Sequence, residues 1–578
     1  MISRKGFAVL AAVLVIAAVS CGCVANLGRE PGWGKPTTLD FTLQKDVKIP
    51  ERPVVIFLCD GLRKETFDQM LAAGELPSIK HFLVDRGVFV ENAVTSLPTV
   101  TYAVISSYAT GRYPGHAGIL GNKWFDPAYL VSQDYTEIDT MGLVNDDILG
   151  PTLYELLDRE KSCVVLSQIN RGCSRFHENW MVAGVSWFFG MFRNVSMSTT
   201  ARLQDMAAAA NKDKRWPELV TLYYPATDEV AHRDGVDAPQ YREMIKVFDN
   251  EVGDACKAFE KEGLLERLML VVITDHGMTN TPRHCNVPEA LTALGANLYT
   301  KKLYELPAHY WARAARFADP DVVALVDSYR LAKLYFRLPG LSWNHRPTLE
   351  EIRALGAAWR QHRFWGDPPK GDEVTDLVKR LAGLEGVKFA VHSDRGRPET
   401  RVHIINTVGT AVITRHVEAN GKVYRYEVTG GQDPLGYTGV PVAQALIDGK
   451  FHSADEWLAT TIGTEHPDFV SQLTEMFEST RSGDLALFAK PGWDFSGHNK
   501  GGHGGLAREE TIVPMIIAAP GLPAGERLPY ARTLALAPTV YEQIRGNKPA
   551  AVFEEFDCDS LLDKLRAAGK NVPSGTKN

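Results

Sequence analysis

Short apolar segments of strand length alternate with longer amphipathic segments along most of this chain. The amphipathic segments include residues 152–159, with Pro151 near the start, and residues 241–262, whose apolar positions recur at helical spacing. Continuous apolar strands separated by helices are typical of a mostly parallel sheet with helices on both faces, so the sequence predicts an α/β fold. The predicted strands cover residues 54–58, 88–94, 163–166, 219–223, 268–273, 485–489 and 514–518.

Residues 295–451 have a different character from the rest of the chain. Residues 308–337 are rich in aromatic side chains and predict a helix, and residues 348–384 are charged and predict further helices. Residues 387–428 alternate apolar and polar positions, with Asn420-Gly421 as the expected hairpin turn. We interpret residues 295–451 as an inserted cap carried by a main domain of residues 51–294 and 452–578. Several surface loops without a shared core are the alternative.

The N-terminal residues 1–20 have the features of an export signal. Arg4 and Lys5 precede an apolar run from Ala8 to Val19, which is too short for a comfortable bilayer span. The run leads through small residues into Cys21, and this pattern resembles the bacterial lipobox, in which the cysteine is lipidated and becomes the mature N-terminus. We therefore predict a tether at residues 21–50 and an exported lipoprotein, anchored to a membrane at Cys21, that faces the periplasm or the cell surface. Plain secretion and an uncleaved anchor are the alternatives.

The charge of the chain excludes one class of substrate. The chain has 63 Lys and Arg residues against 70 Asp and Glu residues, a net charge of −7, so it offers no broad basic surface to a nucleic-acid backbone. We therefore expect no long polynucleotide as a substrate. The cysteines that follow the signal are widely and irregularly spaced without a CxxC pair, so a cysteine zinc site is not expected. An oxidising compartment would permit disulfides whose pairing the sequence does not give.

Two predicted strands are followed by residues that can bind a metal ion. Asp60 follows the strand at residues 54–58, and Asp275 and His276 follow the strand at residues 268–273. Ligand sites of open α/β folds collect at the carboxyl ends of the strands, so these side chains are placed for binding. Taken alone, an Asp-Gly pair after a strand, such as Asp60-Gly61, is more often an ordinary turn. Either one or both of Asp275 and His276 can face a metal.

Two further motifs offer ligands of the same kind. Asp228 and His232 follow the strand at residues 219–223, and their spacing puts them on one face of a helical turn. His503 lies in the run Gly501-Gly502-His503-Gly504-Gly505, where the glycines suit a close approach of the backbone. A solvated helix face and a flexible loop are the structural alternatives. The four motifs together make coincidence an unattractive explanation, and their mixture of carboxylates and imidazoles favours zinc, although manganese or iron can occupy the same geometry.

In this order the motifs resemble those of the alkaline phosphatase superfamily, and most closely its nucleotide pyrophosphatase/phosphodiesterase type. The resemblance covers residues 53–278 and 489–521, and residues 537–539 resemble the closing helix of the family. Its most specific part surrounds the expected nucleophile, although Ala103-Val104 replaces the usual Pro-Asn and a His-Gly pair is set one residue further apart. The matching landmarks are Pro98-Thr99-Val100-Thr101, Thr110-Gly111-Arg112-Tyr113-Pro114, His116, Gly118 and Asn122.

The resemblance implies an alkaline-phosphatase-like three-layer α/β/α sandwich with a mostly parallel central sheet and an inserted cap region before the last histidine. It also implies two metal ions, expected to be zinc, and a phosphothreonine formed at Thr101. Asn122 and the backbone amide of Thr101 would hold the remaining charge of the phosphoryl group. The implied ligands are Asp60, Thr101, Asp275 and His276 for one metal, and Asp228, His232 and His503 for the other.

Two residues bear on the choice of substrate. Tyr102 occupies the place where the nucleotide-cleaving relatives carry an aromatic side chain that stacks on the base, with packing beneath a helix as the alternative. The monoesterases of the superfamily add cationic donors, commonly a Lys and an Arg, whereas the corresponding segment here offers Arg171 without a lysine. We therefore predict hydrolysis of phosphodiester or nucleotide pyrophosphate bonds in a small phosphate ester or nucleotide. A phosphomonoesterase is the runner-up.

Other functions fit the sequence less well. A sulfatase is disfavoured because no Cys-x-Pro-x-Arg or Ser-x-Pro-x-Arg segment occupies the nucleophile position. Cofactor-independent phosphoglycerate mutases share the metal core, but they are normally cytoplasmic and use a serine, so the export signal and Thr101 count against them. The alternative of another class is a catalytically inactive surface lipoprotein that binds a partner through the inserted region. The retention of every ligand position argues against it.

Overall fold

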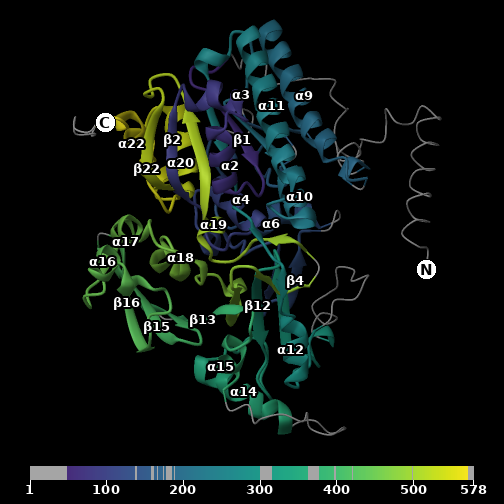
Figure 1. Ribbon diagram of the computed structural model, residues 1–578, viewed down its shortest axis with the longest axis vertical. Helices are drawn as coiled ribbons and strands as arrows, with labels where there is room; N and C mark the ends of the chain where they lie inside the picture. The colour runs from purple at the N-terminus through teal and green to yellow at the C-terminus, as the bar shows by residue number, and fades with distance from the viewer. Residues whose placement is uncertain are drawn as a thin grey trace, which may run out of the picture.

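Two eight-stranded sheets, one above the other in Figure 1, organise the chain. The computed structural model describes residues 49–136, 140–157, 162–165, 167–173, 175–177, 185–187, 189–299, 315–361, 376–395, 399–419, 421–497 and 499–570. Cys21 and the predicted signal lie outside the described residues, as does nearly all of the predicted tether. Within the described part of the chain, no helix has both the length and the apolar character needed to cross a bilayer.

The first sheet is mostly parallel, as predicted. Its neighbouring strands run parallel except at β21, which is antiparallel to both β8 and β2. The order across the sheet is β22 (Glu526–Arg532), β2 (Val88–Val94), β21 (Ile512–Ala518), β8 (Met269–Ile273), β1 (Val54–Cys59), β7 (Leu219–Tyr224), β5 (Ser162–Val165) and β6 (Arg175–His177).

Helices cover both faces of this sheet, because alternate residues of its strands are buried on opposite sides. In β1, Val55 and Phe57 belong to one apolar core, whereas Val54 and Ile56 belong to another. The first core includes α2 (Lys64–Ala72), α9 (Phe192–Asp213), α10 (Ala226–Asp234) and α11 (Pro239–Lys261). The second includes α4 (Thr101–Thr110), α7 (Leu153–Leu157), α20 (Leu536–Arg545) and α22 (Leu562–Ala567). The predicted three-layer α/β/α sandwich is therefore confirmed.

The second sheet is antiparallel throughout and has its own apolar cores. Helices α17 (Ala454–Thr461) and α18 (Phe469–Met476) belong to the core on one face, and α14 (Leu349–Gln361) and α15 (Leu377–Ala382) to the core on the other. Its strand order is β11 (Val322–Asp327), β12 (Leu331–Phe336), β18 (Leu485–Ala489), β13 (Val387–Arg395), β14 (Glu399–Ile405), β15 (Gly409–Glu418), β16 (Gly421–Gly431) and β17 (His452–Ser453). The predicted hairpins are present, and a shared core exists.

Two expectations about this region are wrong. Residues 322–327 and 331–336, which we expected in a helix, form β11 and β12. β12 is buried along its whole length, so it lacks the alternation that marks a half-buried strand, and a continuous apolar run does not distinguish strand from helix. Residues 485–489, expected in the parallel sheet, form β18 between β12 and β13. The second sheet therefore extends beyond residues 295–451.

Candidate metal centre

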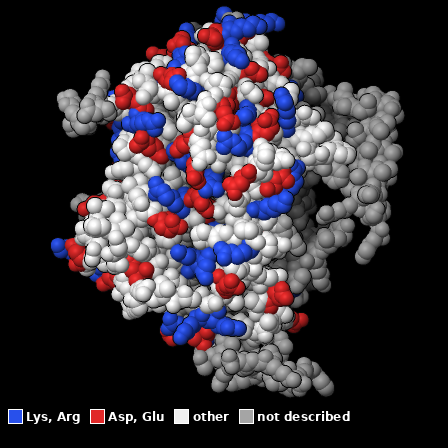
Figure 2. Space-filling model, viewed as in Figure 1, with Lys and Arg blue, Asp and Glu red and all other residues white. Residues whose placement is uncertain are grey.

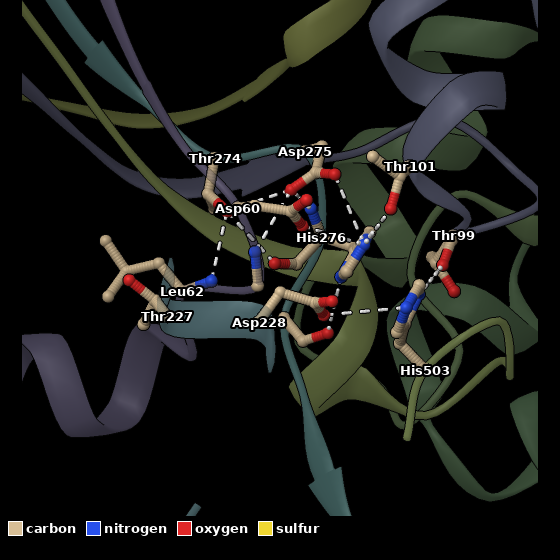
Figure 3. A network of polar contacts seen from close by, with 12 residues as sticks. Asp60, Leu62, Thr99, Thr101, Thr227, Asp228, Thr274, Asp275, His276 and His503 are labelled. Atoms are coloured by element: carbon tan, nitrogen blue, oxygen red, sulfur yellow. Dashed lines mark hydrogen bonds and ion pairs between the residues drawn. The ribbon is translucent and has the colours of Figure 1, made fainter. Parts of the chain in front are cut away.

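The first group of possible metal ligands lies at the carboxyl ends of two neighbouring parallel strands. Asp60 follows β1, and Asp275 and His276 follow β8. Nε2 of His276 lies 3.4 Å from Oδ1 of Asp60 and 3.2 Å from Oδ2 of Asp275. It also lies 3.2 Å from Oγ1 of Thr101, the first residue of α4 (Figure 3). Both Asp275 and His276 therefore face the same point, and all four residues are buried.

The second group comes from α10 and from the glycine loop. Oδ2 of Asp228 lies 3.3 Å from Nε2 of His232, one helical turn away, and Oδ1 of Asp228 lies 3.6 Å from Nε2 of His503. Gly501 lets this loop approach α10, because a Cβ atom there would lie only 2.4 Å from the carbonyl oxygen of Ala231. The rings of His276 and His503 stack with centroids 3.5 Å apart, so the two groups adjoin.

Both groups contain carboxylate oxygens that lack a hydrogen-bond partner. Oδ1 of Asp60, Oδ1 of Asp228 and Oδ2 of Asp275 are buried and have no hydrogen-bond partner among the described residues. Burial, together with the charge of Asp275, raises the pKa of Asp60 well above its usual range. Burial would also raise the pKa of Asp228, but His232 and His503 outweigh it and hold that pKa below its usual range. Divalent cations would supply the missing partners, so the residues fit two metal ions.

The histidines are oriented to bind through Nε2. Nδ1 of His232 lies 2.8 Å from the carbonyl oxygen of Gly501, and Nδ1 of His503 lies 2.8 Å from that of Thr99. Nδ1 of His276 lies 3.1 Å from the carbonyl oxygen of Gly277. A carbonyl oxygen only accepts, so each Nδ1 carries the proton and leaves the lone pair of Nε2 for a metal.

Thr101 and Asn122 lie close together at the start of α4. Oδ1 of Asn122 accepts a hydrogen bond of 3.2 Å from the backbone N–H of Tyr102, next to Thr101. The amino group of the Asn122 side chain therefore remains to donate elsewhere. The N-terminus of a helix attracts anions, so a phosphoryl group beside Thr101 would meet favourable backbone dipoles.

The remaining predicted site residues are engaged elsewhere. The Tyr102 side chain is 7% exposed, its hydroxyl donates to the carbonyl oxygen of Tyr135 at 3.1 Å, and the two rings lie 5.1 Å apart. This burial leaves little ring surface for a nucleotide base. The Arg171 guanidinium donates to the carbonyl oxygen of Ile148 at 2.7 Å and pairs with Glu155 at 3.3 Å. These contacts hold Arg171 against α7 and the loop that precedes it, and the structure gives it no contact with the metal groups.

Sequence reasoning missed the residues that support the ligands. The hydroxyl of Tyr223, in β7, donates to Oδ2 of Asp60. The hydroxyl of Thr274 accepts a hydrogen bond from the backbone N–H of Leu62 and so ties the loop after β1 to the loop after β8 (Figure 3). Buried hydroxyl groups and backbone carbonyls have no sequence signature of their own. Only their place beside the ligands reveals their role.

The parallel sheet with adjoining ligand groups at its carboxyl edge is the architecture of the alkaline phosphatase superfamily. Within it, residues 54–329 match the family described as type I phosphodiesterase / nucleotide pyrophosphatase. The matched part of the chain, residues 54–329, is therefore assigned to this family.

Individual relatives agree with this assignment. The chain is 25% identical over 235 residues to an uncharacterized pyrophosphatase/phosphodiesterase of Schizosaccharomyces pombe. This match covers 39% of this chain and 45% of the relative. The chain is also 26% identical over 227 residues to the human bis(5'-adenosyl)-triphosphatase ENPP4. This second match covers 38% of this chain and 46% of the relative. The matches thus span less than half the length of these relatives.

The solved structure of human ectonucleotide pyrophosphatase / phosphodiesterase 5 has a similar fold. The TM-score is 0.50 at 13% identity, and the match covers 89% of this chain and 100% of that chain. At this identity the likeness supports the fold and nothing finer.

Proposed function

We propose that this protein hydrolyses phosphodiester or nucleotide pyrophosphate bonds of small substrates through a covalent phosphothreonine at Thr101. One observation carries the proposal. The Thr101 hydroxyl begins a helix and lies 3.2 Å from Nε2 of His276, within the same group as the unpartnered oxygens of Asp60 and Asp275. A hydroxyl in this position is a nucleophile placed at a cation site.

Two divalent cations, for which the mixed carboxylate and imidazole set favours zinc, would make the Thr101 hydroxyl easier to deprotonate and would neutralise charge on the phosphoryl group. One set of ligands would be Asp60, Thr101, Asp275 and His276, and the other Asp228, His232 and His503. Manganese or iron in the same places would leave the roles of these residues unchanged.

The chain's own groups account for the remaining chemistry. Oγ1 of Thr101 gives up its proton to water and forms a bond to phosphorus while the bond between phosphorus and the leaving oxygen breaks. The leaving group departs with that oxygen, which takes up a proton from water. Water then attacks the phosphothreonine, which releases a phosphate monoester and restores the hydroxyl. The amino group of Asn122 and the backbone N–H of Thr101 would hold phosphoryl oxygens in both steps.

Several observations favour diesters over monoesters and small substrates over polymers. Arg171, the one candidate for the additional cationic donor of a monoesterase, is bound by the loop before α7. On the face shown in Figure 2, basic and acidic side chains are interspersed, and no extended basic surface offers itself to a long nucleic acid. The name of the human relative, bis(5'-adenosyl)-triphosphatase, points to a nucleotide substrate.

The test combines metal analysis with a comparison of substrates. We expect about two zinc ions per chain, loss of activity in chelator, and a kcat/KM for bis-p-nitrophenyl phosphate above that for p-nitrophenyl phosphate. His503→Ala should lower the occupancy of one site only. A substrate ratio well below one would favour the monoesterase, and active protein without a transition metal would overturn the metal mechanism. Bound metal without turnover of any ester would favour the inactive binding protein.

We also propose that the protein is exported and anchored through a lipid on Cys21. The apolar run at residues 8–19 and the small residues before Cys21 support this. Gly22, rather than an aspartate, follows the cysteine, and this favours the outer membrane if the cell has one. Cys21→Ser should release soluble protein, and unchanged membrane fractionation of that variant would refute the anchor.

A further inference from the structure

The hairpin turn between β11 and β12 brings the second sheet into the metal centre. The carbonyl oxygen of Ser328 accepts a hydrogen bond of 3.1 Å from the backbone N–H of His503, and Tyr329 forms an isolated parallel bridge with the same histidine. The ring of Tyr329 meets that of His232 edge to face, with centroids 4.9 Å apart. This tyrosine therefore lies against two residues of the second ligand group.

The backbone of this turn is strained at both central residues. Ser328 has a φ of +45° and Tyr329 a φ of +71°, in the left-handed region that bulky side chains rarely adopt. Such strain persists where the surroundings hold it.

Buried ion pairs on either side of the turn supply that support. Asp327 pairs with Lys333 at 2.7 Å, and Arg330 pairs with Glu510 at 2.7 Å, with all four side chains buried. The Arg330 guanidinium also donates to the carbonyl oxygen of Trp493 at 2.6 Å. The structure around the turn thus holds a half-buried tyrosine in a conformation that glycine or asparagine would adopt more easily.

The place of Tyr329 relative to Thr101 indicates which part of a substrate it meets. In an in-line displacement the leaving oxygen departs opposite the attacking oxygen. Oγ1 of Thr101 lies with the group of Asp60, Asp275 and His276, so in the proposed reaction the leaving oxygen would face the adjoining group of Asp228, His232 and His503. Tyr329 packs on that second group and is partly exposed.

We propose that Tyr329 lines the subsite for the leaving group, where its ring favours substrates that release an aromatic or heterocyclic alcohol. The inference rests on the proposed function and deepens it. Through this turn the second sheet determines which group is released, while the first sheet holds the reacting phosphorus.

The test compares esters that share one half and differ in the other. Thymidine 5'-phosphate esterified with either p-nitrophenol or methanol gives the same thymidylate product, so one chromatographic assay measures both. The quantity of interest is the kcat/KM for the aryl ester divided by that for the methyl ester. Tyr329→Gly removes the ring and relieves the strained backbone, Tyr329→Phe keeps the ring, and Ser328→Gly is the matched control for a more flexible turn.

We expect Tyr329→Gly to lower the ratio about tenfold at unchanged metal content, because stacking of an aromatic group is worth about this factor. Tyr329→Phe and Ser328→Gly should keep the wild-type ratio. An equal loss of kcat/KM on both esters would mean that Tyr329 only orients His232. An unchanged ratio without any loss would mean that Tyr329 does not contact the leaving group. Either result overturns the inference, while activity of the wild type still upholds the proposed function. If Tyr329→Gly does not fold, Tyr329→Asn takes its place, since asparagine tolerates the left-handed region. Failure of the wild type on every ester would overturn the proposed function, and the inference with it.

Discussion

The two sheets contribute to the site in different ways. In the parallel sheet, β1, β7 and β8 end at the same edge, so the segments that follow them bring Asp60, Asp228, Asp275 and His276 together. In the antiparallel sheet successive strands end at opposite edges, and the turn between β11 and β12 reaches the ligands. The parallel sheet therefore gathers ligands at one edge, and the antiparallel sheet adds a hairpin turn to them.

The regions also differ in how they satisfy buried charge. The carboxylates after β1 and β8 keep buried oxygens without hydrogen-bond partners. In the hairpin of the second sheet, Oδ1 of Asp327 also lacks such a partner, but Oδ2 of Asp327 pairs with Lys333, and Arg330 pairs with Glu510. A carboxylate oxygen without a partner can bind a metal cation. A buried ion pair stabilises the folded protein only while both of its members are present. Changes at the metal ligands should alter activity, and changes at the buried ion pairs should alter stability.

The largest effect is expected at the nucleophile. Thr101→Ala should lower kcat by at least about 10⁴-fold, because no other group can form the covalent intermediate. Metal content and thermal unfolding should stay close to wild type, since the other ligands are retained. Thr101→Ser is the control and should keep part of the activity. Wild-type rates in the alanine variant, measured by steady-state kinetics, would show that water attacks phosphorus directly.

The next effect concerns stability in the second region. Lys333→Met leaves the buried Asp327 carboxylate without its ion pair, so the free energy of unfolding should fall by about 3–5 kcal/mol. The double variant with Asp327→Asn should recover most of this, because asparagine is neutral and still accepts from the backbone N–H of Lys123. Denaturant unfolding measures both variants. If the double variant is no more stable than the single one, the unpaired charge is not the cause.

The junction between the regions contains a histidine with an unusual pKa. Burial tends to lower the pKa of His116, but Asp557 and Glu475 outweigh it and raise the value to about 9. Glu475, on α18, is also paired with Lys422 of β16 at 2.7 Å, so the network joins both regions. Lys422 also lies 3.5 Å from Nε2 of His116.

Because the folded protein binds this proton more tightly, the stabilisation is complete below the ordinary pKa of 6.5 and is lost as the pH rises through about 9. The free energy of unfolding should fall by about 3 kcal/mol across this window. His116→Gln should flatten the profile between pH 6 and 10. The same slope in wild type and variant would show that other groups cause it.

The smallest effect is expected at a hydroxyl that supports a ligand. Tyr223→Phe removes the donor to Asp60, so metal affinity or kcat/KM should fall by about 10–100-fold with little change in stability. The matched control is Tyr437→Phe, which removes a buried hydroxyl that donates to the carbonyl oxygen of His466 beneath the second sheet. The control should leave metal affinity unchanged in a competition titration. Equal losses in both variants would contradict a special role for Tyr223.

The two sheets also differ in how well the sequence predicts them. The strands β1, β7 and β8 are continuous apolar runs, and each is followed by a polar motif. Their positions in the chain could therefore be predicted from the sequence. β12 and β18 are also buried throughout, but they pair with each other although they are far apart in the chain, so the pattern did not indicate which sheet they join. Register and sheet membership depend on contacts between distant segments, which hydrophobic periodicity does not encode.

By itself, the sequence determined the kinds of ligand and their order, because metal ions select carboxylates and imidazoles and because these follow recognisable strands. It also determined the parallel sheet that carries them. Only the tertiary structure decided that Tyr102 is buried, that Arg171 is held by a neighbouring loop, and that Tyr329 lies against His232. The physical reason is that a ligand's chemistry belongs to the residue itself, whereas exposure and contact belong to the packing of segments far apart in the chain.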